Sequence, residues 1–283
     1  KIKAKRSQSQ PVAAETQVIK HDAVIWFKTH YIAACQQTGV AAIEDLLAIL
    51  DRAVSKRRQL QELDLNNYKM TSEDVVALSK AFQATLADID KAGRSQISLT
   101  FEPVAIDLSH NQIASGRAVA ELIQAVPFVA ALDAGHNQWG PKPTIEFANA
   151  LGASCGLRTL KISSNMMGSK AGLALLKALE RAKALEVLDL SQNSLDDRVA
   201  SQLAVVIQTV PLNTLRISYN KFKADGVKKV VHAISHNTTL TDLDLTSCGI
   251  GERSKDLLEI LEARDNITRL CIGFNKMPSA FVP

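Results

Sequence analysis

The chain of 283 residues lacks several features that would place it in a large class of proteins. It has no run of about 18 uncharged apolar residues, so no membrane span is expected. It also has no glycine-rich phosphate loop, no GxSxG nucleophile motif and no HExxH metal motif. We therefore expect no enzymatic activity, no cofactor, no metal and no small-molecule substrate.

Cysteine is scarce and scattered. No CxxC pair and no terminal cluster occurs among the four cysteines, which are Cys35, Cys155, Cys248 and Cys271. Small secreted domains stabilised by disulfides have dense cysteine frameworks, whereas isolated cysteines fit a reducing compartment. The pattern predicts a cytoplasmic protein.

Excess positive charge is confined to the first few residues. The chain has 33 basic and 29 acidic residues, and four of the basic ones are Lys1, Lys3, Lys5 and Arg6. The remainder has 29 basic residues against 29 acidic ones, so it lacks the positive surface that nucleic-acid binding needs. We expect residues 1–20 to form a disordered basic tail and the protein not to bind nucleic acid.

What the sequence does contain is an internal repeat with the template Leu-x-x-Leu-x-Leu-x-x-Asn-x-Leu. From Asn111 to Asn275 the Asn position recurs at steps of 26, 28, 28, 27, 28 and 27 residues. Six nearly equal steps indicate a solenoid of stacked units. This position, the Asn slot, is occupied by Tyr68, Asn111, Asn137, Asn165, Asn193, Asn220, Cys248 and Asn275.

One step is irregular and sets the domain boundaries. Tyr68 and Asn111 are 43 residues apart, which implies an insertion near residues 91–103. Residues 59–283 then form the repeat domain, with about eight repeats. Residues 22–37 and 41–55 in front of it have helical patterning, with Asp22 as a candidate N-cap. We expect residues 21–58 to be a helical cap over the first repeat.

Each repeat combines a short strand with a helix. Alternate side chains of the Leu-x-Leu core point inward from the strand, and the Asn side chain can satisfy buried main-chain groups. Cysteine is a usual substitute in this slot, which explains Cys248. One unit cannot bury its own apolar faces, so stacking predicts an α/β solenoid with a parallel sheet on the concave face and helices on the convex face.

The period near 28 residues, from Leu60 to Met277, resembles the ribonuclease-inhibitor-like class of leucine-rich repeats. Secreted leucine-rich-repeat proteins usually carry disulfide-rich caps, and none is visible here. The segment WFKTHYIAACQQTGV, with Tyr31, Cys35 and Gly39, is followed by IEDLLAIL. It resembles the lead-in to the repeats of centrosomal and ciliary proteins and of actin-capping-protein regulators of the CARMIL type. This resemblance implies a structural component of a cytoskeletal or ciliary assembly.

Side chains two, four and six positions before the Asn slot point to the concave face as three rows. In the middle row the first three side chains are all aspartates, which repel one another, so a basic partner segment could bind there. The next four alternate in sign and can neutralise one another. The middle row reads Asp64, Asp107, Asp133, Lys161, Asp189, Arg216, Asp244 and Cys271.

Two other surfaces are candidates for partner binding. The row directly before the Asn slot forms the lip of the sheet and includes His110, His136, Tyr219 and Phe274. Nothing completes a tetrahedral metal site around the two histidines. On the convex side, a basic cluster could meet an acidic partner or simply be solvated, and it comprises Lys221, Lys223, Lys228 and Lys229.

These observations favour a non-enzymatic protein–protein interaction scaffold. The repeats end on a strand, from which we expect a subunit of a multi-subunit assembly at the cytoskeleton, centrosome or cilium. Two alternatives remain open. One is a small-GTPase regulator resembling the Ran-activating leucine-rich-repeat family, although that family has more repeats and a long acidic tail. The other is the sensor module of a larger receptor.

Overall fold

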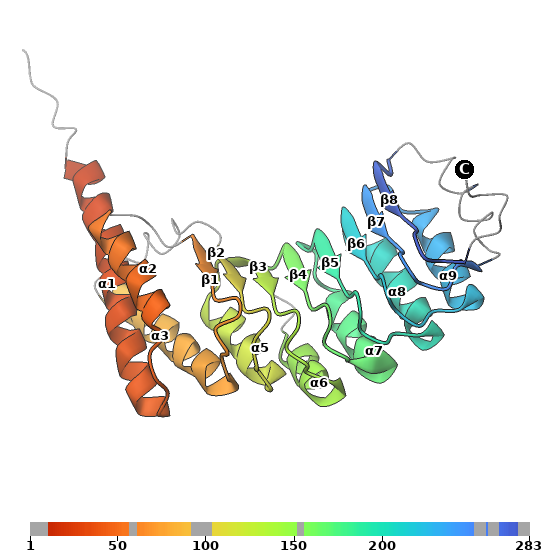
Figure 1. Cartoon of the computed structure of the whole chain (residues 1–283). Coiled ribbons are helices and arrows are strands. Elements are labelled where there is room, and N and C mark those ends of the chain that lie inside the picture. Colours follow the sequence, from red (N-terminus) through yellow and green to blue (C-terminus); the bar gives the residue numbers. More distant parts are fainter. Residues whose placement is uncertain are drawn as a thin grey trace, which may run out of the picture.

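The computed structural model describes residues 11–56, 61–91, 104–151, 156–251, 259 and 266–276. Figure 1 shows a curved solenoid with strands along its inner edge and helices along its outer edge. The strands are β1 (Glu62–Asp64), β2 (Val104–Asp107), β3 (Val129–Asp133), β4 (Thr159–Lys161), β5 (Val187–Asp189), β6 (Thr214–Arg216), β7 (Asp242–Asp244) and β8 (Arg269–Cys271). The helices are α1 (Pro11–Thr38), α2 (Glu44–Ser55), α3 (Ser72–Lys91), α5 (Gly116–Ala125), α6 (Pro141–Ala150), α7 (Gly168–Leu179), α8 (Asp197–Thr209) and α9 (Ala224–Ile234).

The strands form one parallel sheet in sequential order from β1 to β8, which confirms the predicted α/β architecture. Parallel strands need a long crossover, and in most repeats a helix supplies it on the convex side. β1 and β2 pair in register, with Leu63 opposite Ile106, in spite of the irregular step between them. Apart from Lys91 at the end of α3, the expected insertion lies outside the described residues.

The Asn slot joins each repeat to its neighbours. The fully buried Asn193 donates through Nδ2 to the carbonyls of Ile162 (2.7 Å), Leu190 (3.1 Å) and Ser191 (3.1 Å). Its Oδ1 accepts from the backbone N–H of Asn165 at 3.0 Å. One side chain thereby pairs buried main-chain groups of neighbouring repeats, which confirms the predicted role of this slot.

Cys248 occupies the same slot as a structural residue. Its Sγ lies 3.1 Å from the carbonyl of Ile217, and its backbone N–H donates to Oδ1 of Asn275 at 2.8 Å. Burial raises the pKa of the Cys248 thiol to about 12. A thiol with such a pKa stays protonated and unreactive at neutral pH.

The helical segment in front of the repeats is longer than expected. α1 begins at Pro11, so Asp22 lies inside the helix and is not its N-cap. Residues 12–20 contain no Gly or Pro, and a proline at the first turn suits the start of a helix. Residues 11–20, expected to belong to the tail, are thus helical, and residues 1–10 lie outside the described part. α2 begins at Glu44, a few residues after the expected start at 41.

α1 packs against α3, the helix of the first repeat, and against α2. The Phe27 ring lies 4.3 Å from the ring of Phe82 on α3, measured between centroids. Tyr31 is fully buried, and its hydroxyl accepts from the backbone N–H of Ile43 at 3.2 Å. Gly39 follows α1 with φ +73°, a left-handed conformation that commonly ends a helix. The Tyr31 and Gly39 positions of the lead-in segment therefore fix the turn between α1 and α2.

Candidate functional site

The middle row of the concave face lies where the sequence places it. The backbone partners run from Asp64 through Asp107 and Asp133 to Lys161, with no register shift between these four positions. The same row continues through Asp189, Arg216, Asp244 and Cys271. Asp64 and Cys271 are exposed, and the positions between them are partly buried. The row is thus a continuous, solvent-accessible line of side chains.

The aspartates of this row share a local function that the sequence analysis missed. Oδ1 of Asp107 accepts from the backbone N–H of Ser109 at 2.8 Å and from its hydroxyl at 2.6 Å. Oδ1 of Asp133 accepts from the backbone N–H of Gly135 at 3.0 Å. This bond from residue i+2 closes the chain after the strand, as Asx turns do. The sequence pattern that could have revealed this bond is an aspartate followed two positions later by a small residue. The same bond occurs at Asp64, Asp189 and Asp244.

The charge pairing along the row differs from the prediction. Lys161 Nζ lies 3.3 Å from Asp133 Oδ2, so Asp133 is neutralised by the lysine of the next strand. Lys161 was expected to pair within the alternating set instead. A lysine can reach a carboxylate on either neighbouring strand, so the place of Lys161 in the row does not by itself determine which aspartate it pairs with. Asp64 and Asp107 have no cation within 4.0 Å among the described residues.

Arg216 also pairs outside its own row. Its guanidinium lies 3.2 Å from Asp242 Oδ2, two positions earlier on the adjacent strand, and Arg269 binds the same oxygen. Asp242 is buried, with 6% of its surface exposed. A buried carboxylate needs such partners, because an unpaired one is costly. This Arg–Asp–Arg cluster was not anticipated, since the relevant contacts cross between two rows.

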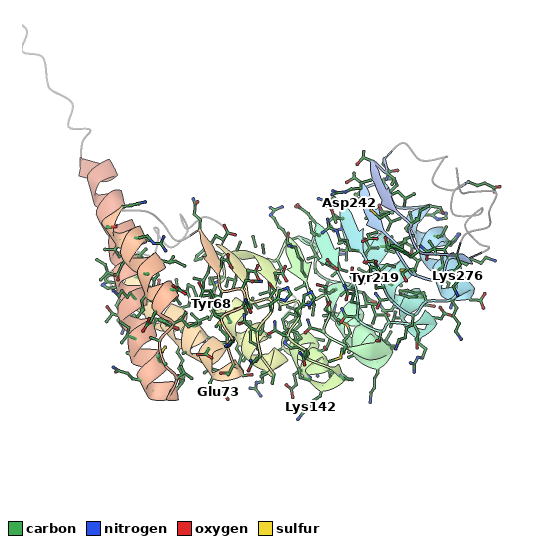
Figure 2. The ribbon with its side chains drawn as sticks, in the orientation of Figure 1. Tyr68, Glu73, Lys142, Tyr219, Asp242 and Lys276 are labelled. Carbon is green, nitrogen blue, oxygen red and sulfur yellow. The ribbon has the colours of Figure 1, made fainter. Side chains whose placement is uncertain are left out.

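The lip has an unusual backbone. Every repeat has a positive φ at this position, including 54° at Tyr219 and 56° at Phe274. Both aromatic side chains project into solvent, with exposures of 51% and 83%. Figure 2 shows Asp242 at the level of the strands and Tyr219 below it, toward the helices.

His110 and His136 stack on each other in the lip. Their ring centroids are 4.0 Å apart, and the planes differ by 11°. Burial lowers the pKa of His136 below its ordinary value, and the neighbouring His110 lowers it further. No group of three or more His, Cys, Asp or Glu residues suited to a metal ion occurs in the part of the chain that the structure describes.

The four lysines of the predicted basic cluster are exposed, but they belong to two elements. Lys221 and Lys223 lie in the loop after β6, and the backbone N–H of Lys223 donates to Asp197 Oδ1 at 2.8 Å. Lys228 and Lys229 lie on α9, where Nζ of Lys229 donates to the hydroxyl of Ser201 on α8 at 3.1 Å. The loop pair adjoins the lip, and the helix pair belongs to the convex surface.

The match of a known family model supports the repeat architecture. A family model described as Leucine Rich repeat matches residues 236–253, a range that includes β7. The fold is a leucine-rich-repeat solenoid. A solved structure described as "Leiomodin-1 Actin-Binding Site 2 (ABS2)" is 22% identical and has a TM-score of 0.35. The match covers 38% of this solenoid and 64% of that chain. In the described residues no helix is long and apolar enough to cross a membrane.

Proposed function

We propose that this leucine-rich-repeat solenoid is a non-enzymatic scaffold that binds other proteins through the concave face of its sheet. The observation that carries the proposal is the in-register stacking of Asp64 and Asp107 on neighbouring strands. Both carboxylates are accessible, and neither has a cation within 4.0 Å among the described side chains. A basic segment of a partner would supply the missing positive charge.

The surroundings of Asp64 add to the negative charge at this end of the sheet. Glu62 lies on the same strand and is exposed. Burial raises the pKa of Tyr68, and the carboxylates of Asp45 and Asp64 raise it further, against the opposing effect of Arg52. Negative charge from Asp45 on α2 and from Asp64 on β1 therefore acts together at Tyr68, which favours a basic partner at the N-terminal end of the concave face.

We place the scaffold in the cytoplasm, within a cytoskeletal, centrosomal or ciliary assembly. The support is the lead-in segment, in which Tyr31, Cys35 and Gly39 resemble the segment before the repeats of such proteins. In this chain Tyr31 and Cys35 are buried and Gly39 shapes the turn, so the resemblance concerns how the first repeat is covered. The lead-in segment thus supports the proposed type of assembly, and the concave row supports the proposed way in which partners are bound.

The experiment is proximity labelling in cells with the tagged protein and a variant carrying Asp64→Asn and Asp107→Asn. The amide introduced at position 107 keeps an oxygen to accept from Ser109, so the fold is preserved while two negative charges are removed. We expect the main labelled partners to drop at least five-fold. Asp244→Asn is the matched control, because Asp244 makes the same local bond at the other end of the row.

An unchanged set of partners in the double variant would contradict the concave-face assignment. A GTP hydrolysis assay with small GTPases separates the scaffold from the regulator alternative, because stimulation of hydrolysis by the purified protein would overturn the non-enzymatic scaffold.

A further inference from the structure

One edge of the solenoid carries no acidic residue. This edge consists of the lip and the row directly after the Asn slot, which we call the flanking rows. None of the sixteen positions that the eight repeats contribute to these rows is Asp or Glu. The row after the slot reads Lys69, Gln112, Gln138, Met166, Ser194, Lys221, Gly249 and Lys276.

Exposed apolar side chains follow this edge at regular intervals. Met166, Tyr219 and Phe274 are 57%, 51% and 83% exposed, and they belong to the fourth, sixth and eighth repeats. Of the five large hydrophobic side chains that are exposed in the described residues, three therefore lie in the flanking rows. Isolated exposed hydrophobics are ordinary, but a line of them along one edge indicates a contact surface.

The fold does not account for these side chains. Met166, Tyr219 and Phe274 have φ values of 51°, 54° and 56°. Asn and Gly adopt this left-handed region more readily than bulky residues do. Neither burial nor backbone preference favours an aromatic ring at the two lip positions. The positive φ recurs at the lip of every repeat, so the backbone there belongs to the repeat and the choice of exposed rings at Tyr219 and Phe274 is left for a partner to explain.

Positive charge accompanies both aromatic rings. Lys221 follows Tyr219 across the Asn slot, and Lys276 follows Phe274 in the same way. Both lysines are exposed. Lys223, also exposed, extends the positive charge along the loop after β6. The sixth and eighth repeats thus present the same pair of an aromatic ring and an ammonium group.

The acids in the adjacent loops have partners of their own. Asp196 binds Arg198, with 2.7 Å between Oδ2 and the guanidinium. Asp197 accepts from the backbone N–H of Lys223. Asp225 lies in the first turn of α9, where a carboxylate interacts favourably with the helix N-terminus. Within the described residues neither Lys221 nor Lys276 forms an ion pair, so both ammonium groups can meet an acidic ligand.

We propose that the flanking rows of the fourth to eighth repeats bind an acidic protein segment that carries regularly spaced apolar side chains. Tyr, Phe and Met are enriched at protein interfaces, and the lysines attract acidic groups. Strands lie about 4.8 Å apart, so the backbone positions of Tyr219 and Phe274, two repeats apart in the same row, are separated by about 10 Å. A polyproline-II segment rises about 9 Å in one turn of three residues, so its every third side chain lies on one face at nearly that spacing. The inference rests on the proposed scaffold function but uses a different surface from the concave row.

The test uses the purified chain and three fluorescein-labelled synthetic peptides in an anisotropy titration. The probe has Leu at every third position with Asp and Glu between. One control replaces the acids with Lys, and the other replaces Leu with Ser. We expect the probe to bind and each control to bind at least ten-fold more weakly, with affinity for the probe falling as salt rises.

Two variants locate the binding. Tyr219→Asn with Phe274→Asn removes both rings while supplying a residue that tolerates positive φ, so the melting temperature should stay the same or rise. We expect at least a ten-fold loss of affinity for the probe. Lys221→Gln with Lys276→Gln should weaken binding and flatten its salt dependence. Asp64→Asn with Asp107→Asn, on the concave row, should leave it unchanged.

Failure of the probe to bind, or equal binding of the lysine peptide, would overturn the inference. So would ring-deleted protein that binds as well as the original. A lower melting temperature of that protein would show that the rings serve the fold, which is equally decisive against the inference. In each case the concave-face partners would be unaffected, and the proposed scaffold function would stand on its own test.

Discussion

At the scale of single residues, the Asn slot carries most of the information about the fold. Asn193 pairs main-chain groups of neighbouring repeats, and a side chain with both a donor and an acceptor is needed for this. Cys248 keeps the donor through its thiol and still fills the slot. The donor bonds are therefore the more essential part of the interaction.

Replacing Asn193 with Ala should lower the free energy of unfolding by about 3 kcal/mol, because buried carbonyls and one buried N–H lose their partners. Asn193→Cys should cost less, since a thiol can still donate as Cys248 does. Urea unfolding followed by far-ultraviolet circular dichroism measures both, with Asn149→Ala at an exposed position of α6 as the control. Equal losses for Ala and Cys would show that the donor bonds are not what stabilises the slot.

At this scale the sequence predicted where residues lie in the repeat, but it did not predict which charged side chains pair. The Asn slot, the rows and their register follow from periodicity, because stacked strands of equal spacing can align in only one way. The partner of Lys161 did not follow, because a flexible side chain can reach either neighbouring strand. The burial of Asp242 between two arginines depends on contacts between rows that periodicity does not describe.

At the scale of elements, the helices of adjacent repeats approach one another closely at glycine positions. A Cβ placed on Gly116 in α5 would lie 1.9 Å from the carbonyl oxygen of Pro143 in α6. The obstructing atom belongs to the backbone, so no side-chain rotation can relieve the clash. The two helices would have to separate. Gly116 therefore sets the distance between α5 and α6.

Gly116→Ala should lower the free energy of unfolding by about 2 kcal/mol, since overpacking costs more than the helical preference of alanine returns. Gly156→Ala is the matched control, because a Cβ there meets no atom within 4 Å. Thermal melting of both variants checks the expectation. A Gly116 variant that melts like the control would mean that α5 and α6 can move apart without loss.

The boundaries of elements were predicted less well than their existence. The helical patterning before the repeats indicated two helices, yet α1 begins at Pro11 and passes through Asp22. An N-cap residue promotes a helix start only where the preceding residues do not continue the helix. Residues 12–20 have no helix-breaking residue, so local propensity extends α1 beyond the apolar pattern.

At the scale of the whole molecule, the solenoid is a one-dimensional array in which each repeat contacts mainly its neighbours. α1 covers the first repeat through Phe27 and Phe82. The eighth strand lies at the far end of the sheet. Damage at one end should therefore be felt most strongly by the nearest repeats.

Phe27→Ala should speed hydrogen exchange in β1 and α3 while leaving β6 and β7 nearly unchanged, because a large buried ring is lost from the N-terminal end alone. Leu243→Ala, in the buried centre of β7, should give the opposite pattern. Exchange monitored by mass spectrometry distinguishes the two. Equal acceleration throughout the chain in both variants would indicate a single cooperative unit instead.

The pairing of β1 with β2 has a practical consequence for protein engineering. Oδ1 of Asn111 accepts from the backbone N–H of Met70 at 2.9 Å, as though the two repeats followed at the regular interval. The hydrogen bonds between these two repeats therefore do not depend on the number of residues that join α3 to β2. Changing the number of residues between α3 and β2 should therefore leave the pairing of β1 with β2 intact, which makes the length of this connection a variable that protein engineering can alter.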